Sequence, residues 1–385
     1  LGLVGSEMCI RDRGSESRNR YLLKNTLIFT LGNIGSRMIS FFLIPLYTNV
    51  LTTSQYGTVD LITTISTVAG PMLTLNIAES VMRFGLDKDA DKEKNTQCGS
   101  IVLLIAMIIG LVLIPICRCI TEVSDYAIYV YFYVISLSAS QLFLCDLRGK
   151  ELLLKYSLGN ILQTLMIAIL NITFLLVFKM ETGGYLLAYI IANFIVAIYA
   201  IIAGKGYKAF SFHNIDRCKL KEMIRYSVVL IPNTFMWWIM NSSDRVMVTY
   251  MIGAAANGIY AVSYKLPTLV STLTGIFNQA WSYSAIREEG TSDETEYNNK
   301  MFKTLSAIAF MMGIGLLLLT KPFLGVYVAD SYYDAWKYTP FLIIGCVYLT
   351  LGTFMATSYT VHKDSFGYLF SGSFGAAFNL SLIHI

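Results

Sequence analysis

The sequence contains little charge and few of the side chains that enzymes use in catalysis. Only 14% of its 385 residues are charged, and three are histidine. The histidines, His213, His362 and His384, fall outside the long apolar stretches. So little charge does not fit a water-soluble domain of this length. The histidines form no pattern that predicts a metal site or a nucleophilic triad.

The seven cysteines show no spacing typical of a metal site or a disulfide framework. The one close pair is Cys117-x-Cys119. We expect the cysteines to pack as small apolar side chains. The sequence therefore predicts no metal and no cofactor, and leaves open a coupling ion, H⁺ or Na⁺.

Apolar residues are abundant, and they come in long stretches. They make up 55% of the chain, and the mean hydropathy is +0.58. Each complete stretch holds about 20 residues or more, enough to cross a hydrocarbon core of ~30 Å. We predict an integral membrane protein with ten full spans and an eleventh that is cut short. The stretches are Asn25–Val50, Gly57–Val81, Cys98–Ile120, Tyr126–Cys145, Ser157–Phe178, Gly184–Gly204, Tyr226–Ile252, Ile259–Ile286, Met301–Thr320, Tyr338–Tyr359 and Ser365 onward.

The distribution of lysine and arginine predicts the orientation in the membrane. If the N-terminus is cytoplasmic, the inward segments hold 22 of the 29 basic residues and the outward segments hold four. Cytoplasmic loops of membrane proteins carry such an excess. The net charge of +4 therefore reflects orientation and predicts no nucleic-acid partner.

The two chain ends resemble translated sequencing-adapter sequence, namely LGLVGSEMCIRDRG at the start and SLIHI at the close. We expect both to lie outside the fold, and we expect the natural protein to continue past Leu380. The predicted organisation is a non-native or cytoplasmic lead, a six-helix N-terminal lobe, a basic cytoplasmic linker, an incomplete C-terminal lobe and a probable artefact. These cover residues 1–20, 21–204, 205–225, 226–380 and 381–385, respectively.

Arg37 lies inside the first apolar stretch, which contains no Asp or Glu. An arginine near the bilayer centre costs roughly 2.5–3.5 kcal/mol or more, so such residues usually face a hydrated cavity. Four of the predicted spans, the first, second, seventh and eighth, carry stripes of polar residues at helical spacing. These spans are predicted to line a cavity, although for any single stripe simple helix–helix packing remains an equal alternative. Prolines in them predict kinks; they are Pro45, Pro71, Pro232 and Pro267.

A weak internal repeat predicts two similar lobes. At an offset of 201 residues, Gly57 aligns with Gly258, Thr48 with Thr249, Thr67 with Thr268, and Leu51 with Ile252. The offset covers six spans, an even number, so the two lobes would have the same orientation. Parallel repeats of this kind can rock against each other around a central site.

Three segments carry a resemblance to a known family. They are KNTLIFTLGNIGSRMISFFLIPLYTNVLTTSQYGTVDL, TLNIAESVMRF and IPNTFMWWIMNSSDRVMVTYMIGAAANGIYAVSYKLPTLVSTLTGIFNQAWSYSAI. The chain resembles the polysaccharide biosynthesis flippases, the O-antigen and capsule translocases of the multidrug/oligosaccharidyl-lipid/polysaccharide superfamily. The resemblance implies an all-α membrane bundle of two pseudo-symmetric six-helix lobes around a central cavity, C-terminally truncated here. It also implies translocation of undecaprenyl-diphosphate-linked oligosaccharide across the bacterial cytoplasmic membrane.

Cationic side chains inside such a cavity would offset the cost of moving a diphosphate through hydrocarbon. We therefore expect Arg37 to bind the diphosphate. Further substrate-binding candidates are Asn33, Asn241, Arg245, Lys265, Asn278 and Gln279. Three tryptophans could stack on sugars, although anchoring or core packing is favoured for them; they are Trp237, Trp238 and Trp281.

Two carboxylates, Asp60 and Asp244, lie at a depth similar to that of Arg245 and Lys265. We hypothesise that these four residues form an interlobe ion-pair gate, and structural helix pairing is an equal alternative. Asp244 and Arg245 are helix neighbours and point in different directions, so one of them is expected to meet another helix.

Two other functions are weighed against the flippase. A cation-coupled multidrug exporter is disfavoured because the first span has an arginine and no carboxylate. A membrane polysaccharide polymerase or ligase is less favoured, because the outward loops are short and lack a catalytic constellation. The expected partners are the lipid-linked oligosaccharide, membrane lipid, and polysaccharide polymerase and assembly proteins.

Overall fold

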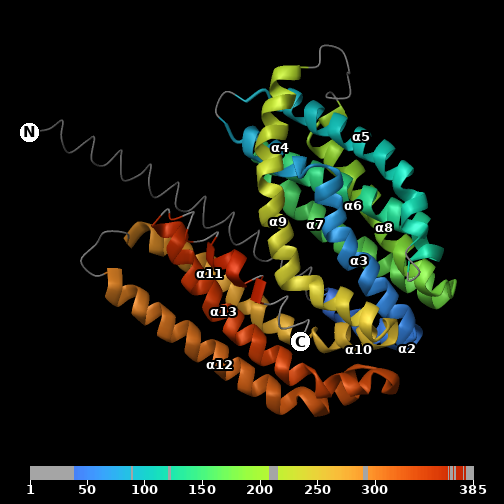
Figure 1. Ribbon diagram of the computed structural model, residues 1–385, viewed down its shortest axis with the longest axis vertical. Coiled ribbons are helices and arrows are strands. Elements are labelled where there is room, and N and C mark those ends of the chain that lie inside the picture. Colours follow the sequence, from blue (N-terminus) through green and yellow to red (C-terminus); the bar gives the residue numbers. More distant parts are fainter. Residues whose placement is uncertain are drawn as a thin grey trace, which may run out of the picture.

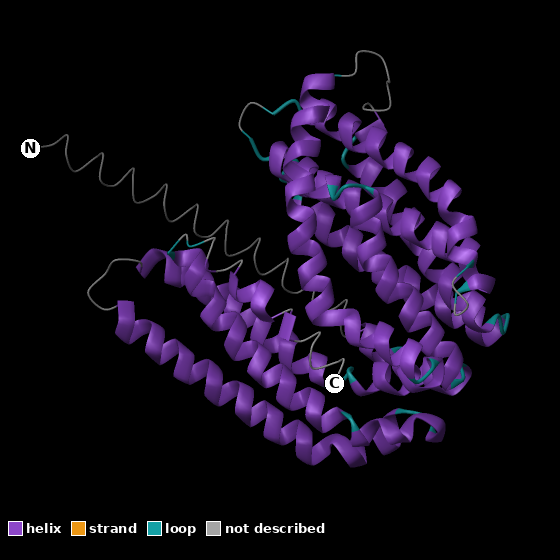
Figure 2. Ribbon diagram, in the orientation of Figure 1, coloured by secondary structure: helices purple, strands orange, loops and turns teal. Residues whose placement is uncertain are grey.

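The computed structural model describes residues 39–87, 90–119, 123–207, 216–288, 294–362, 364, 367, 370–375 and 377–378. Within these ranges the chain is almost entirely helical and contains no strand (Figure 2). The prediction of an all-α fold is confirmed. The first predicted span, Asn25–Val50, lies mostly outside the described residues.

The first half of the described chain forms one group of helices. Its core consists of apolar side chains from α4, α5, α6 and α8, joined by Met223 of α9. Close packing within the group is visible where α4 meets α6, since an added Cβ on Gly85 would lie 2.9 Å from Cα of Gly149. The elements are α2 (Ile44–Val50), α3 (Thr53–Leu73), α4 (Ile77–Gly85), α5 (Lys92–Arg118), η1 (Ser124–Tyr126), α6 (Ala127–Gly149), α7 (Leu153–Ile172), η2 (Thr173–Val177) and α8 (Glu181–Ala203).

The second half begins with a long helix that lies against the first group. This helix, α9 (Arg217–Met251), contacts α3, α4 and α5, and its C-terminal end contacts α10. The last three long helices pack on one another (Figure 1). The elements after α9 are α10 (Ala254–Ser263), α11 (Pro267–Glu288), α12 (Glu294–Tyr327), η4 (Asp330–Lys337) and α13 (Thr339–Val361).

Six of the described helices are long and apolar enough to cross a membrane. They comprise α5, η1 with α6, α7 with η2, α8, α12 and most of α13. The pair α3 and α4, bent by 61° at a short break, makes a seventh if the two helices are counted as one broken span. The stretches predicted at Tyr226–Ile252 and Ile259–Ile286 are also helical, but α9 and α11 do not reach the same apolarity. Within the described residues, apolarity alone therefore identifies fewer spans than the ten predicted, and most of the first predicted span lies outside these residues.

Two of the prolines predicted to kink a span, Pro71 and Pro267, lie at helix ends. Pro71 lies in the last turn of α3, directly before the 61° bend to α4. Its carbonyl accepts a hydrogen bond from the backbone amide of Asn76, which adopts the left-handed conformation. Pro267 is the first residue of α11, so it begins a helix and does not kink one. The predicted span Ile259–Ile286 is interrupted instead by the turn between α10 and α11.

Apart from α9, which packs along α3, α4 and α5, the second half meets the first group at one end of the molecule. A single apolar cluster there joins α2, α3 and α8 of the first group to α10, α12 and η4 of the second. Away from this end, α11, α12 and α13 diverge from the first group (Figure 1). By the predicted topology the joined end, where α3 and α10 begin, faces outward.

Candidate functional site

The helices α3 and α10 cross in backbone contact at Gly57 and Gly258. A Cβ added to Gly57 would lie 1.8 Å from the carbonyl oxygen of Ala254, and one added to Gly258 would lie 2.0 Å from that of Thr53. Real side chains do not fit at such distances, so glycine is required at both positions. The two contacts are related by the same 201-residue offset that aligns the halves in the sequence. The crossing is therefore a pseudo-symmetric contact between the two halves.

An ion pair lies one helical turn beyond this crossing. Nη1 of Arg245 on α9 donates to Oδ1 of Asp60 on α3 at 2.9 Å. The side chains are 18% and 7% exposed, respectively. Nδ2 of Asn257 on α10 donates to the other carboxylate oxygen at 3.3 Å and to the carbonyl of Gly57 at 2.9 Å. Asp60 therefore connects α3 to both α9 and α10.

The other predicted carboxylate has a different partner. The hydroxyl of Tyr260 on α10 donates to Oδ2 of Asp244. Oδ1 of Asp244 accepts from the backbone amide of Arg245 at 3.0 Å. The guanidinium of Arg245 also lies over the ring of Tyr264, 5.2 Å from its centroid. The charges on α9 are thus held by aromatic residues of α10 as well as by Asp60.

Lys265 lies in the turn between α10 and α11 and is half-buried. It is near enough to Asp60 and Arg245 to interact with both electrostatically. Its ammonium makes no hydrogen bond and no ion pair with the described part of the chain. A cation in this position has its full bonding capacity available for an anion.

The contact between α3 and α9 continues toward the opposite end. Nε1 of Trp238 donates to the carbonyl of Thr64 at 2.9 Å. Further along, Nδ2 of Asn76 donates to the hydroxyl of Thr234 at 3.3 Å. The polar stripes of these helices therefore face each other and are partly used for helix pairing.

Of the remaining predicted site residues, the side chains of Asn241 and Asn278 lie within the described part of the chain. Asn241 donates its amide to the backbone carbonyl of Trp237 on its own helix. Asn278 lies half-buried on α11, and the helix also includes Gln279, whose side chain is outside the described residues. Arg37 and Asn33 are outside the described residues as well.

Several residues of this contact were absent from the sequence predictions. Asn257, Tyr260 and the Gly57–Gly258 crossing all belong to it. The repeat already aligned Gly57 with Gly258. The position of Asn257 next to Gly258 was the sequence signal that could have pointed to this asparagine. The partner of Arg245 required the helix arrangement, because Asp60 is 185 residues away. No set of three or more His, Cys, Asp or Glu side chains in the described part of the chain could hold a metal ion.

The fold is that of transporters of the MOP superfamily. The chain is similar to a mutant of the Vibrio cholerae MATE transporter VcmN, with TM-score 0.59 and 14% identity over 93% of this chain and 87% of that one. It is also similar to a multidrug resistance MATE family transporter in its outward-facing conformation, with TM-score 0.59 and 14% identity over 91% and 84% of the chains. For an inward-facing conformation the TM-score is 0.54 and the identity 12%, over 92% and 94%.

The family follows from the sequence match. Residues 22–283 match the family described as polysaccharide biosynthesis protein, and the chain belongs to that family. A search of curated proteins finds no match. The protein is therefore a multi-pass membrane protein of the polysaccharide biosynthesis family with the MOP transporter fold. The family expected from the sequence is confirmed.

Proposed function

We propose that the protein is a flippase that moves polyprenyl-diphosphate-linked oligosaccharide across the bacterial cytoplasmic membrane. The observation that carries this proposal is the cationic pair Arg245 and Lys265 at the junction of the two groups of helices. The family match to polysaccharide biosynthesis proteins supports the substrate class. The likeness to multidrug transporters supports the fold alone.

The two cations have different roles in this proposal. Arg245 is held by Asp60 at 2.9 Å, whereas Lys265 has no ionic partner in the described part of the chain. A diphosphate needs several positive charges or hydrogen-bond donors to leave water. Lys265 supplies the available charge, and Arg245 would add a planar fork suited to phosphate oxygens if it left Asp60. Arg37, the first-choice ligand predicted from the sequence, lies outside the described residues and remains a proposed ligand of the diphosphate.

The proposed mechanism is alternating access. The Gly57–Gly258 crossing and the Asp60–Arg245 pair join the two groups at the end that the basic residues predict to be outward. In this arrangement the substrate would enter from the cytoplasmic side. Opening the joined end would separate α3 from α9 and α10, and would release Arg245 toward the diphosphate.

The experiment is complementation of a flippase-deficient bacterial host with the full-length gene, with outer-leaflet lipid-linked oligosaccharide as the readout. We expect restoration by the wild type, and loss of restoration with Lys265→Gln or Arg37→Ala at matched membrane levels. Lys321→Gln is the control, because its ammonium lies over the Trp336 ring and forms no part of the Asp60–Arg245 ion pair. Full activity of the Lys265→Gln and Arg37→Ala variants would refute the cationic site.

A further inference from the structure

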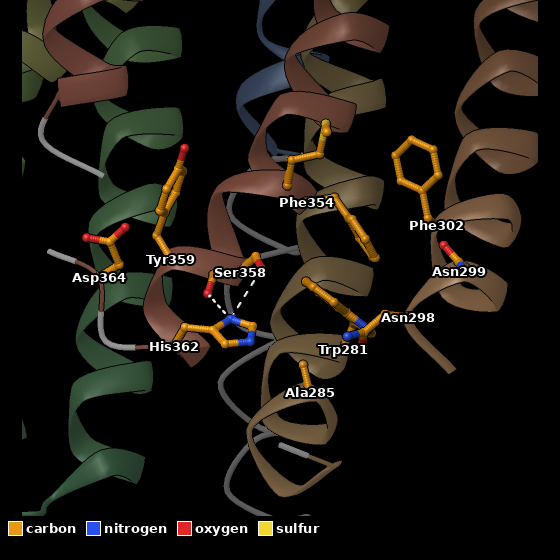
Figure 3. Close-up of a pocket in the computed structure, with 11 residues that line it drawn as sticks. Trp281, Ala285, Asn298, Asn299, Phe302, Phe354, Ser358, Tyr359, His362 and Asp364 are labelled. Carbon is orange, nitrogen blue, oxygen red and sulfur yellow. Dashed lines mark hydrogen bonds between the residues drawn. The ribbon is translucent and has the colours of Figure 1, made fainter. Parts of the chain in front are cut away.

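A cavity lies between α11, α12 and α13, away from the Asp60–Arg245 ion pair. Its volume is about 690 Å³, within the roughly 300–1,000 Å³ of small-molecule sites. Side chains from the end of α11, the start of α12 and the end of α13 surround it (Figure 3). By the predicted topology these three helix ends face the cytoplasm.

One wall of this cavity is aromatic. The rings of Trp281 and Phe354 are stacked with centroids 3.8 Å apart, and Phe302 lies 5.4 Å from Phe354. Trp281 is 5% exposed and Phe354 is 6% exposed. The stack is therefore a rigid, largely buried part of the wall whose position is set by α11 and α13 together, and the half-buried ring of Phe302 is the aromatic surface more open to the cavity.

Two buried polar atoms beside this wall have no hydrogen-bond partner within the described part of the chain. They are Nε1 of Trp281, a donor, and Oδ1 of Asn298, an acceptor. Leaving such a group unsatisfied costs about 1–3 kcal/mol, so native proteins rarely do so without a reason. A ligand that presents an acceptor and a donor would satisfy both.

The rest of the lining combines apolar Ala285 and Met355 with polar side chains, among them the carboxylate of Asp364, and carries no lysine or arginine in the part that the structure describes. Asn299 adds a second amide, and Ser358 and His362 add a hydroxyl and an imidazole. Nδ1 of His362 lies 2.9 Å from the carbonyl of Ser358, and Nε2 lies 3.7 Å from a carboxylate oxygen of Glu294. Without a fixed cation, the cavity is unsuited to a diphosphate.

We propose that this cavity binds an uncharged N-acetylated sugar ring of the transported oligosaccharide. A sugar ring has an apolar face that packs on an aromatic ring such as that of Phe302, and hydroxyls that need several hydrogen-bond partners. An acetamido group adds an N–H donor and a C=O acceptor, which match the amide of Asn298 and the indole N–H of Trp281. This inference rests on the proposed function for the origin of the sugar.

The position of the cavity separates sugar recognition from diphosphate recognition. Trp281 follows Lys265 by 16 residues, which is roughly 24 Å along a helix. The sugar site and the cationic site therefore lie near opposite ends of α11. The sugar site would hold the head group at the cytoplasmic entrance, and the cations would act deeper in the protein.

The test uses the full chain in lipid nanodiscs and a soluble probe without lipid or phosphate, the N-acetylglucosamine trimer. Binding is measured by saturation-transfer difference NMR at millimolar sugar. We expect binding to the wild type, at least tenfold weaker binding to Asn298→Ala and Trp281→Phe, and unchanged binding to Thr304→Ala. Thr304 is the matched control because it lies on an exposed part of α12 and its hydroxyl bonds only to Lys300 of its own helix. Thermal unfolding of each variant confirms that it is folded.

Two outcomes would overturn the proposal: no binding to the wild type, or binding that Asn298→Ala and Trp281→Phe both leave intact. The use of two variants keeps the test decisive if one of them fails to fold. The outcome is separate from the proposed function, since trimer binding does not require transport. Binding without restoration of lipid-linked oligosaccharide in the host would leave the sugar site standing and reject the flippase. Restoration without binding would do the reverse.

Discussion

At the scale of single residues, the Asp60–Arg245 pair is the most consequential contact between the two halves. Both side chains are largely buried, and the carboxylate also accepts from Asn257. Removing one partner of a buried pair leaves an uncompensated charge and costs about 3–5 kcal/mol. Under the proposed mechanism that cost applies only while the joined end is closed, so the pair would bias the protein toward the closed arrangement.

We therefore predict that Asp60→Asn shifts the protein toward an open outer end. To measure this shift, a cysteine is placed at Ala335 in a cysteine-free background and labelled with a membrane-impermeant maleimide. Ala335 is fully buried in the apolar cluster at the joined end. Labelling should increase at least tenfold in Asp60→Asn. Adding Arg245→Gln should reverse part of the increase, because the unpaired cation is then removed.

Asp244→Asn provides the matched comparison. Asp244 bonds to Tyr260 and to a backbone amide, so this change should increase labelling less than Asp60→Asn does. Equal labelling of the wild type and Asp60→Asn would show that the Asp60–Arg245 pair does not keep the outer end closed and contributes only to helix packing.

At the scale of elements, the crossing of α3 and α10 determines how closely the halves approach. Because Gly57 and Gly258 each meet a carbonyl oxygen, any side chain there must push the helices apart. Over-packing of this kind costs about 1–3 kcal/mol. The cost falls on the closed arrangement and disappears when the helices separate.

We predict that Gly57→Ala and Gly258→Ala each shift the equilibrium toward the open end by about 5- to 150-fold. The same labelling of Ala335→Cys reports the shift. Gly275→Ala on α11 is the control, since no atom lies within 4 Å of its added Cβ. Gly57→Ala labelling no faster than Gly275→Ala would contradict the close crossing.

The elements were largely predictable from the sequence, and their partners were not. Apolar stretches located the helices because burial in lipid requires long apolar runs. The spacing of Gly57 and Gly258 pointed to a repeat, but not to a backbone contact. The pairing of Asp60 with Arg245 and of Asp244 with Tyr260 depends on helix rotation, which a one-dimensional pattern does not fix. The cavity beside Trp281 joins three helices, so no local motif marked it.

At the scale of the whole molecule, orientation connects the structure to the direction of transport. The joined end carries Lys337, and the opposite end carries Lys94 and Lys219. The excess of basic residues predicts that the joined end faces outward. All three side chains lie in salt bridges with carboxylates of their own segments. Replacing Lys94 or Lys337 breaks only a local pair, and replacing Lys219 also removes the contact of its ammonium with the Phe84 ring of α4.

We predict that cysteines at Lys94 and Lys219 react with an impermeant maleimide only in permeabilised cells, whereas a cysteine at Lys337 reacts in intact cells. Surface ion pairs contribute about 0–1 kcal/mol, so all three variants should insert normally. Labelling on the opposite sides would invert the topology and make the joined end cytoplasmic.

We propose that the protein moves a diphosphate-linked sugar lipid through a cationic junction. The most direct measurement is translocation of a polyprenyl-diphosphate trisaccharide in proteoliposomes that contain the full-length protein. A lectin added outside detects the trisaccharide that reaches the outer leaflet. We expect translocation by the wild type, at least tenfold lower translocation activity with Lys265→Gln, and unchanged activity with Lys321→Gln. Transport of a cationic drug but not of the sugar lipid, or full activity of Lys265→Gln, would contradict it.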